Sequence, residues 1–194
     1  MIQSIEKYRI FDLALLSLLA TIAEVAGEVL HDKLPGAGYY LSFSMLIAII
    51  AMIRWGIWGS LVYVISGIPM IFLHHDPENI DIFKNILLYP ISYVFIVIAA
   101  VYFKIINRND IKNNRFYLLT YTLFSYICVS LGKGFSTYIL SGNFWEASVN
   151  TVEYLVIHAF NIVMVYIVLL IIRGRKGLLV NMDKYVDEIR TNSK

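Results

Sequence analysis

The segment from Ile10 to Leu30 constrains this chain more than any other. It is apolar over about the 20 residues that a bilayer-crossing helix needs, yet Glu24 and Glu28 lie in its last third. Ionisable groups inside a membrane usually face the interior of a helix bundle or a water-filled cavity. We therefore interpret this segment as the wall of a pocket. The alternative is that both acids reach water at the membrane surface, with Lys33 as their partner.

The same segment has a face of small residues. At helical spacing, Ser17, Thr21, Glu24 and Glu28 share one side, and Ala20, Ala23 and Gly27 form a stripe beside it. Stripes of small residues let the backbone of another helix approach closely. We expect Ala20, Ala23 and Gly27 to contact a partner subunit.

The composition is typical of an integral membrane protein. Hydrophobic residues make up 59% and charged residues only 15%, whereas soluble domains have about half and about a quarter. Charged or turn-rich breaks separate six apolar segments, which are residues 10–30, 41–53, 57–73, 85–103, 116–140 and 152–172. The sequence predicts an all-α integral membrane protein of six transmembrane helices over residues 1–176, in which the second helix is short for a bilayer.

Basic residues predict the orientation. If the N-terminus is cytoplasmic, all Lys and Arg residues except Lys33, Lys84 and Lys133 lie on the cytoplasmic side, and so does the C-terminus. This sidedness accounts for the net charge of +2, so we expect no nucleic-acid partner. Residues 177–194 are predicted to form a cytoplasmic amphipathic tail that lies on the inner leaflet or against a partner subunit.

Candidate binding residues gather toward the outer ends of the predicted helices. Lys133 lies within the fifth segment, where a lysine is costly unless paired or hydrated, so it contacts a ligand or neutralises Glu24, Glu28 or Glu153. Aromatic residues flank the outer loops, and the sixth segment begins with several polar groups within one sector of a helix. The candidate substrate-binding residues are Glu24, Glu28, Tyr39, Tyr40, Lys133, Trp145, Glu153, Tyr154, His158 and Asn161.

His158 has two interpretations of equal weight, a satisfied structural group or a group that lines a cavity. Aromatic faces and a few polar groups together suit a planar, heteroaromatic ligand.

We expect no metal and no cofactor: His74, His75 and Asp76 fit a solvated turn before Pro77 better than a metal site. The chain also has no phosphate-binding loop, so any use of ATP requires partner proteins.

Several stretches resemble the S components, the substrate-binding membrane subunits of energy-coupling factor (ECF) transporters. The stretches are Tyr40-Leu41-Ser42-Phe43-Ser44, Arg54-Trp55-Gly56, a small-residue third helix with Gly67, and Leu87-Leu88-Tyr89-Pro90 followed by Ser92-Tyr93. The resemblance covers nearly the whole chain. It implies a compact six-helix bundle in a prokaryotic plasma membrane, with the binding site at the end of the fifth helix and the start of the sixth.

The resemblance also implies a function. An S component captures a small water-soluble vitamin or precursor at its outer side and delivers it with a membrane scaffold (T component) and two cytoplasmic ATPase subunits. Leu88 stands where the thiamine-binding branch has an acidic residue, and Met1-Ile2-Gln3 lacks the histidine of the cobalt and nickel branch. These departures argue against thiamine and against a metal substrate. The alternatives are a stand-alone carrier or channel and, third, a membrane enzyme.

Overall fold

The computed structural model describes residues 2–33, 41–73, 81–175, 177–185 and 188, and these residues form helices and the turns between them. Four described helical segments are long and apolar enough to cross a membrane: Glu6–His31, Ser44–Leu73, Ile82–Ile105 and Arg115–Ser141. The bent pair Phe144–Ile157 and Ala159–Ile172 adds a fifth if it forms one span. The described chain is thus all-helical, and its apolar helices are consistent with a membrane protein.

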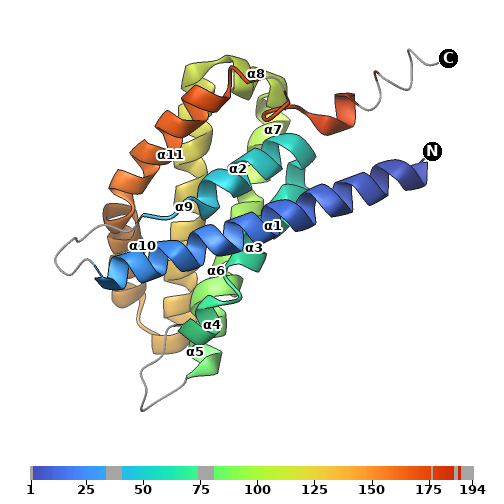
Figure 1. The fold of residues 1–194 in the computed structure, drawn as a ribbon. Helices are drawn as coiled ribbons and strands as arrows, with labels where there is room; N and C mark the ends of the chain where they lie inside the picture. Colours follow the sequence, from blue (N-terminus) through green and yellow to red (C-terminus); the bar gives the residue numbers. More distant parts are fainter. Residues whose placement is uncertain (1, 34–40, 74–80, 176, 186–187, 189–194) are drawn as a thin grey trace.

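The first helix, α1 (Ile2–Lys33), runs diagonally across the bundle and packs on α2 (Ser44–Trp55) and α3 (Ser60–Ser66) (Figure 1). Ala20 is buried there against Ala51 and Val62. A Cβ on Gly27 would lie 2.7 Å from the carbonyl oxygen of Leu41. The stripe of Ala20 and Gly27, expected to face a partner subunit, is therefore covered by this chain's own residues, and Ala23 beside it is half-buried.

The predicted second and third spans form a hairpin. After α2 the chain turns through η1 (Gly56–Gly59) into α3 and α4 (Met70–Leu73), and Gly56 has a positive φ of 60°. A Cβ on Gly59 would lie 2.3 Å from the backbone of Ala51, so the two arms touch. With 12 residues, α2 is about 18 Å long, which is less than the hydrocarbon core of about 30 Å.

The predicted fourth span is a broken helix. It consists of α5 (Ile82–Ile86), η2 (Leu87–Ile91), α6 (Ser92–Val94), η3 (Phe95–Val101) and α7 (Tyr102–Ile105). Pro90 lies inside the π-helical turn η2 and supplies no N–H to the helix. The hydroxyl of Ser92 donates to the carbonyl oxygen of Leu88, one turn earlier, at 2.6 Å. The irregular helix brings Tyr89 and Tyr93 toward the bundle interior.

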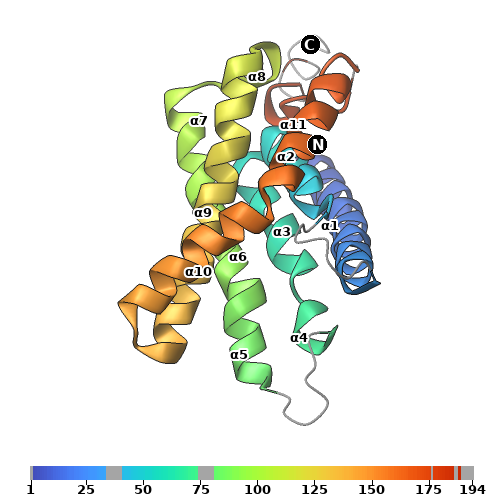
Figure 2. The same cartoon turned by 90° about the vertical axis from the view of Figure 1, so that its left-hand side faces the viewer.

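The last helices form a second hairpin. The short α8 (Arg108–Asn113) leads into α9 (Arg115–Ser141), Gly142 closes the next turn with a φ of 66°, and α10 (Phe144–Ile157) returns along α9 (Figure 2). Between α10 and α11 (Ala159–Ile172), the helix axis bends by 48° at His158. This bend turns the start of α11 toward the core of the bundle.

The predicted tail begins with a segment that packs on the bundle. Leu179 is fully buried in the main hydrophobic core, and Met182 is buried as well. The guanidinium of Arg54 donates to the carbonyl of Gly177 at 2.6 Å. Within its described part, the tail thus buries Leu179 and Met182 in this chain, whereas Leu178 and Tyr185 remain exposed.

Close packing of α9 on α6 gives the first testable prediction. A Cβ on Gly132 would lie 2.2 Å from the carbonyl oxygen of Ser92, and backbone cannot move aside as a side chain can. We expect Gly132→Ala to lower the free energy of unfolding by about 1–3 kcal/mol, the usual effect of overpacking. Thermal unfolding in detergent measures this. Gly174→Ala is the control because its Cβ would meet no atom within 4 Å; equal stability of both variants would contradict the prediction.

Candidate binding site

The carboxylate of Glu24 is the centre of a buried polar cluster. It is only 2% exposed, and three hydroxyl groups donate to it. The hydroxyl of Tyr93 lies 2.7 Å from Oε1 and that of Ser42 lies 2.7 Å from Oε2, which Ser44 also contacts. Glu28, one turn further along α1, is buried too. Both carboxylates therefore face the bundle interior, and Glu24 joins α1 to α6 and to the start of α2.

Tyrosine rings form one wall beside Glu24. The rings of Tyr63 and Tyr93 are stacked with their centroids 4.3 Å apart, and Tyr89 meets Tyr93 edge-on at 6.4 Å. The hydroxyl oxygens of Tyr63 and Tyr154 are 3.3 Å apart. These rings come from α3, η2, α6 and α10, so four separate segments of the chain build the wall.

Lys133 places its ammonium group among these rings. Its Nζ lies 4.1 Å from the ring centroid of Tyr89, 5.1 Å from that of Tyr93 and 5.9 Å from that of Tyr154. Cation–π attraction stabilises a lysine in such a position. Glu24 and Glu28 are also near enough to interact electrostatically with its charge. Two carboxylates are therefore available as counter-ions for Lys133, in agreement with one of its two predicted roles. The three tyrosine rings also stabilise its ammonium group.

The bend between α10 and α11 supplies the other side of the cluster. The ring of His158 stacks on Tyr154 with centroids 3.9 Å apart, and His158 Nδ1 lies 2.9 Å from the carbonyl oxygen of Tyr154. Asn161 is 1% exposed, and its Nδ2 donates to the hydroxyl of Tyr126 at 2.9 Å. Among the residues that the structure describes, its buried Oδ1 has no hydrogen-bond partner. A buried acceptor without a donor is costly, so this oxygen suits the N–H or O–H group of a ligand.

The structure brings together only part of the predicted site. Glu24, Glu28, Lys133, Tyr154, His158 and Asn161 meet in one region or next to it. Trp145 is 76% exposed near the start of α10, and Glu153 is exposed on the same helix. The structure therefore does not bring these two side chains into the cluster. Tyr39 and Tyr40 lie outside the described residues.

Other members of the cluster were not among the predicted binding residues. These are Ser42, Ser44, Tyr63, Tyr89, Tyr93 and Tyr126. The sequence around these tyrosines has no polar periodicity that would distinguish them from aromatic residues that face lipid. Ser42 lies just before α2 and Ser44 is the first residue of that helix, and this close spacing is the local signal that both hydroxyl groups could reach a single acceptor.

The cluster has the chemistry of a small-molecule site. It combines ring faces, a carboxylate, an ammonium group and an unsatisfied amide oxygen, a mixture that is typical of ligand pockets. Among the described residues, no group of three or more His, Cys, Asp or Glu side chains is arranged to hold a metal ion. Comparisons of the chain with protein-family models, with curated proteins and with solved structures find no match, so the site is interpreted from its own residues.

Proposed function

We propose that this chain is the substrate-binding membrane subunit of an ECF-type importer. In this proposal it has six membrane segments with both termini in the cytoplasm. It captures a small, planar, water-soluble vitamin or precursor at its outer side, and a scaffold subunit with two ATPase subunits drives delivery. The observation that carries the proposal is the buried cluster around Glu24 and Lys133, with the unsatisfied Oδ1 of Asn161 beside it.

The position of the cluster along the helices supports an outer site. Lys133 is 18 residues into α9 from Arg115, which corresponds to about 27 Å. Arg115 belongs to the basic end of the bundle, together with Arg54, Arg108 and Arg173. Because basic residues mark the cytoplasmic side, the cluster lies in the outer half of the membrane in this proposal, where a substrate can enter.

The internal hydrogen bonds indicate which groups a ligand would use. The carboxylate of Glu24 already accepts from three hydroxyl groups, and the ammonium of Lys133 is held by rings and carboxylates. Asn161 Oδ1 accepts from no group in the described residues. We therefore propose a ligand whose flat ring packs on the tyrosines and whose N–H or O–H group donates to Asn161.

Binding to variants of Asn161 tests this site. We expect calorimetric titration of the detergent-purified chain with water-soluble vitamins to identify a ligand. Asn161→Ala should weaken its binding about 5- to 100-fold, because one hydrogen bond in a dry site contributes about 1–3 kcal/mol.

A control separates this effect from general damage. Trp145→Ala removes a ring that is exposed and lies outside the cluster. This variant should bind with the affinity of the parent chain. Unchanged affinity of Asn161→Ala would show that this amide is not part of the site.

Co-purification tests the transport partners. An importer subunit should be recovered from its native membrane together with a scaffold subunit and an ATPase pair. Uptake of the same ligand by vesicles that contain this chain alone, without ATP, would instead show a stand-alone carrier.

A further inference from the structure

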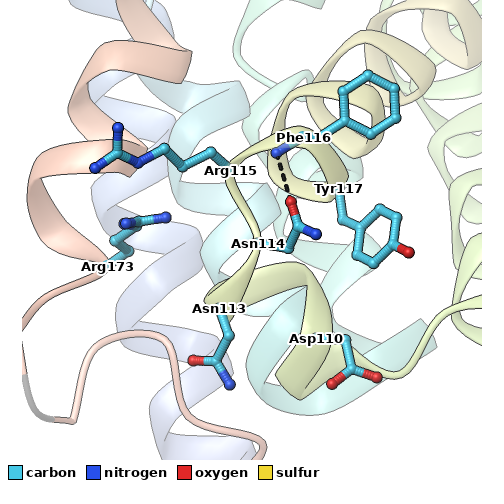
Figure 3. Close-up of a pocket in the computed structure, with 7 residues that line it drawn as sticks. All are labelled: Asp110, Asn113, Asn114, Arg115, Phe116, Tyr117 and Arg173. Atoms are coloured by element: carbon cyan, nitrogen blue, oxygen red, sulfur yellow. Dashed lines mark hydrogen bonds between the residues drawn. The ribbon is translucent and has the colours of Figure 1, made fainter.

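A second pocket lies at the basic end of the bundle, far from the cluster around Glu24. Its volume is about 580 Å³, and it opens where α8 leads into α9 and where α11 ends (Figure 3). Its lining residues are Asp110, Asn113, Asn114, Arg115, Phe116, Tyr117 and Arg173. This pocket has no part in the proposed import function, and the inference below does not depend on that function.

Two guanidinium groups reach this pocket without partners of opposite charge. Figure 3 shows Arg115 and Arg173 on the same side of the pocket, one from the start of α9 and the other from the end of α11. Among the residues that the structure describes, neither forms an ion pair. Within the described part of the chain, Nη1 of Arg173 is shielded from solvent and has no hydrogen-bond acceptor. Two like charges and a buried N–H without an acceptor are both unfavourable, and one bound anion would relieve both.

The remaining lining groups favour an anion with several oxygen atoms. Guanidinium groups match phosphate through paired, charge-assisted hydrogen bonds. The pocket adjoins the N-terminal end of the 27-residue helix α9, whose dipole also favours negative charge. Asn114 caps this helix by accepting from the N–H of Phe116 at 2.9 Å. The carboxylate of Asp110 lies across the pocket from both arginines (Figure 3), so it does not neutralise them.

The pocket lies at the boundary of the apolar layer. Arg115 begins an apolar segment long enough to cross a membrane, and Arg173 directly follows another apolar helix, α11. The ring of Phe116 is 65% exposed at the rim, where it suits the acyl region next to a headgroup. Phospholipid phosphates lie at this level of a bilayer, and basic pockets between helices bind anionic headgroups.

We propose that this pocket binds the phosphate group of an anionic phospholipid, held between Arg115 and Arg173. A soluble phosphate ester carries the same chemistry, but the position at the edge of the apolar layer and the exposed Phe116 favour the lipid. The experiment below distinguishes the two sources.

Lipid-dependent stability of the detergent-purified full chain tests the proposal. We expect dioleoyl phosphatidylglycerol to raise the Tm, and dioleoyl phosphatidylcholine, which has the same acyl chains but no net charge, to leave it unchanged. In the variant Arg115→Gln/Arg173→Gln, the rise with phosphatidylglycerol should disappear, and native mass spectrometry should show at least a tenfold loss of bound lipid.

The matched control removes the same charge from a neighbouring surface. Lys104 and Lys184 line a separate pocket of about 400 Å³ at the same end of the bundle. Lys104→Gln/Lys184→Gln should therefore keep the stabilisation by phosphatidylglycerol. If both double variants lose it equally, the effect is general electrostatic attraction and the proposal is wrong.

Two further measurements complete the test. Arg173→Lys keeps the charge but loses the planar fork, so it should retain part of the lipid effect even if the glutamine variant folds poorly. Glycerol 1-phosphate at the same phosphate concentration should give no comparable rise in Tm. A full rise with this soluble ester would retain the phosphate site but overturn its assignment to lipid, and an unchanged lipid effect in the arginine double variant would overturn the site itself.

Discussion

Replacing Glu24 with alanine is expected to lower the free energy of unfolding by about 3–5 kcal/mol, the usual effect of removing one partner from a buried charged network. The substitution removes the carboxylate that accepts from Ser44 and Tyr93, and leaves Ser42 with only its weaker acceptors, the carbonyl of Ala23 and the hydroxyl of Ser44. It also removes a negative charge that interacts with the ammonium of Lys133. Thermal and denaturant unfolding of the detergent-purified chain, followed by tryptophan fluorescence, measures the loss.

Glu24→Gln should be less harmful than Glu24→Ala. The amide keeps an oxygen that accepts from two of the three hydroxyl groups and fills the same space, but it carries no charge for Lys133. Glu153→Ala is the matched control because Glu153 is an exposed acid, and its removal should change the stability by no more than about 0.5 kcal/mol. If Glu24→Ala and Glu153→Ala are equally stable, the network does not hold these helices together.

The second large effect is expected at the buried ion pair of Arg54 and Asp12. Nε of Arg54 lies 2.9 Å from Oδ2 of Asp12, which also accepts from the indole N–H of Trp55 at 2.6 Å. The same guanidinium donates to the carbonyl oxygens of Gly177 and Leu178. Arg54 thus connects α1, the α2–α3 hairpin and the segment after α11 at a single point.

We expect Arg54→Met to lower the free energy of unfolding by about 3–5 kcal/mol, because the side chain of Asp12 is only 15% exposed and loses its counter-ion. The double variant Asp12→Leu/Arg54→Met should lose less than the sum of the two single variants, with a coupling of about 0.5–3 kcal/mol. Unfolding curves of the four proteins in one detergent give this double-mutant cycle.

Asp183→Asn is the control for this ion pair. Asp183 pairs with Arg108 at 2.7 Å, but its side chain is half exposed, so the loss should be no more than about 1 kcal/mol. A cysteine at Leu179, which is buried in the parent chain, should also become reactive to a water-soluble maleimide in the Arg54→Met background. A protected Leu179→Cys in that background would mean that Arg54 does not retain the C-terminal segment.

Local sequence patterns were sufficient for the environment of some site residues. Glu24 and Glu28 share a helix face within a segment otherwise made of residues that suit lipid, so the bundle interior or water at the membrane surface were the two expected environments. In the structure both side chains are buried in the bundle. The same reasoning applied to Lys133, Tyr154 and Asn161, which also lie inside the bundle. In each case, exposing the polar group to lipid would cost free energy, so the side chain points into the bundle.

The same patterns failed where two interpretations have the same local signature. Ala20 and Gly27 would let either a partner subunit or this chain approach closely, and α2, α3 and the residues before α2 occupy that surface. Glu153 directly precedes Tyr154 in the sequence and Trp145 is near the start of the same helix, but the positions of both on α10 leave them exposed. Residues that are close in sequence can point to different sides of a helix. Which side faces the cluster cannot be predicted when the start and the tilt of the helix are unknown.

The sequence by itself determined the helical class and the apolar segments long enough to cross a membrane, because segment length, hydropathy and helical spacing are local properties. Only the tertiary structure decided that Glu24 accepts from Ser42, Ser44 and Tyr93, that the two apolar segments around Gly56 fold back as a hairpin, and that Leu179 enters the core. Each of these depends on residues far apart in the chain. Their contacts are set by how the helices tilt and pack, and many arrangements of the same amphipathic segments satisfy the local pattern equally well.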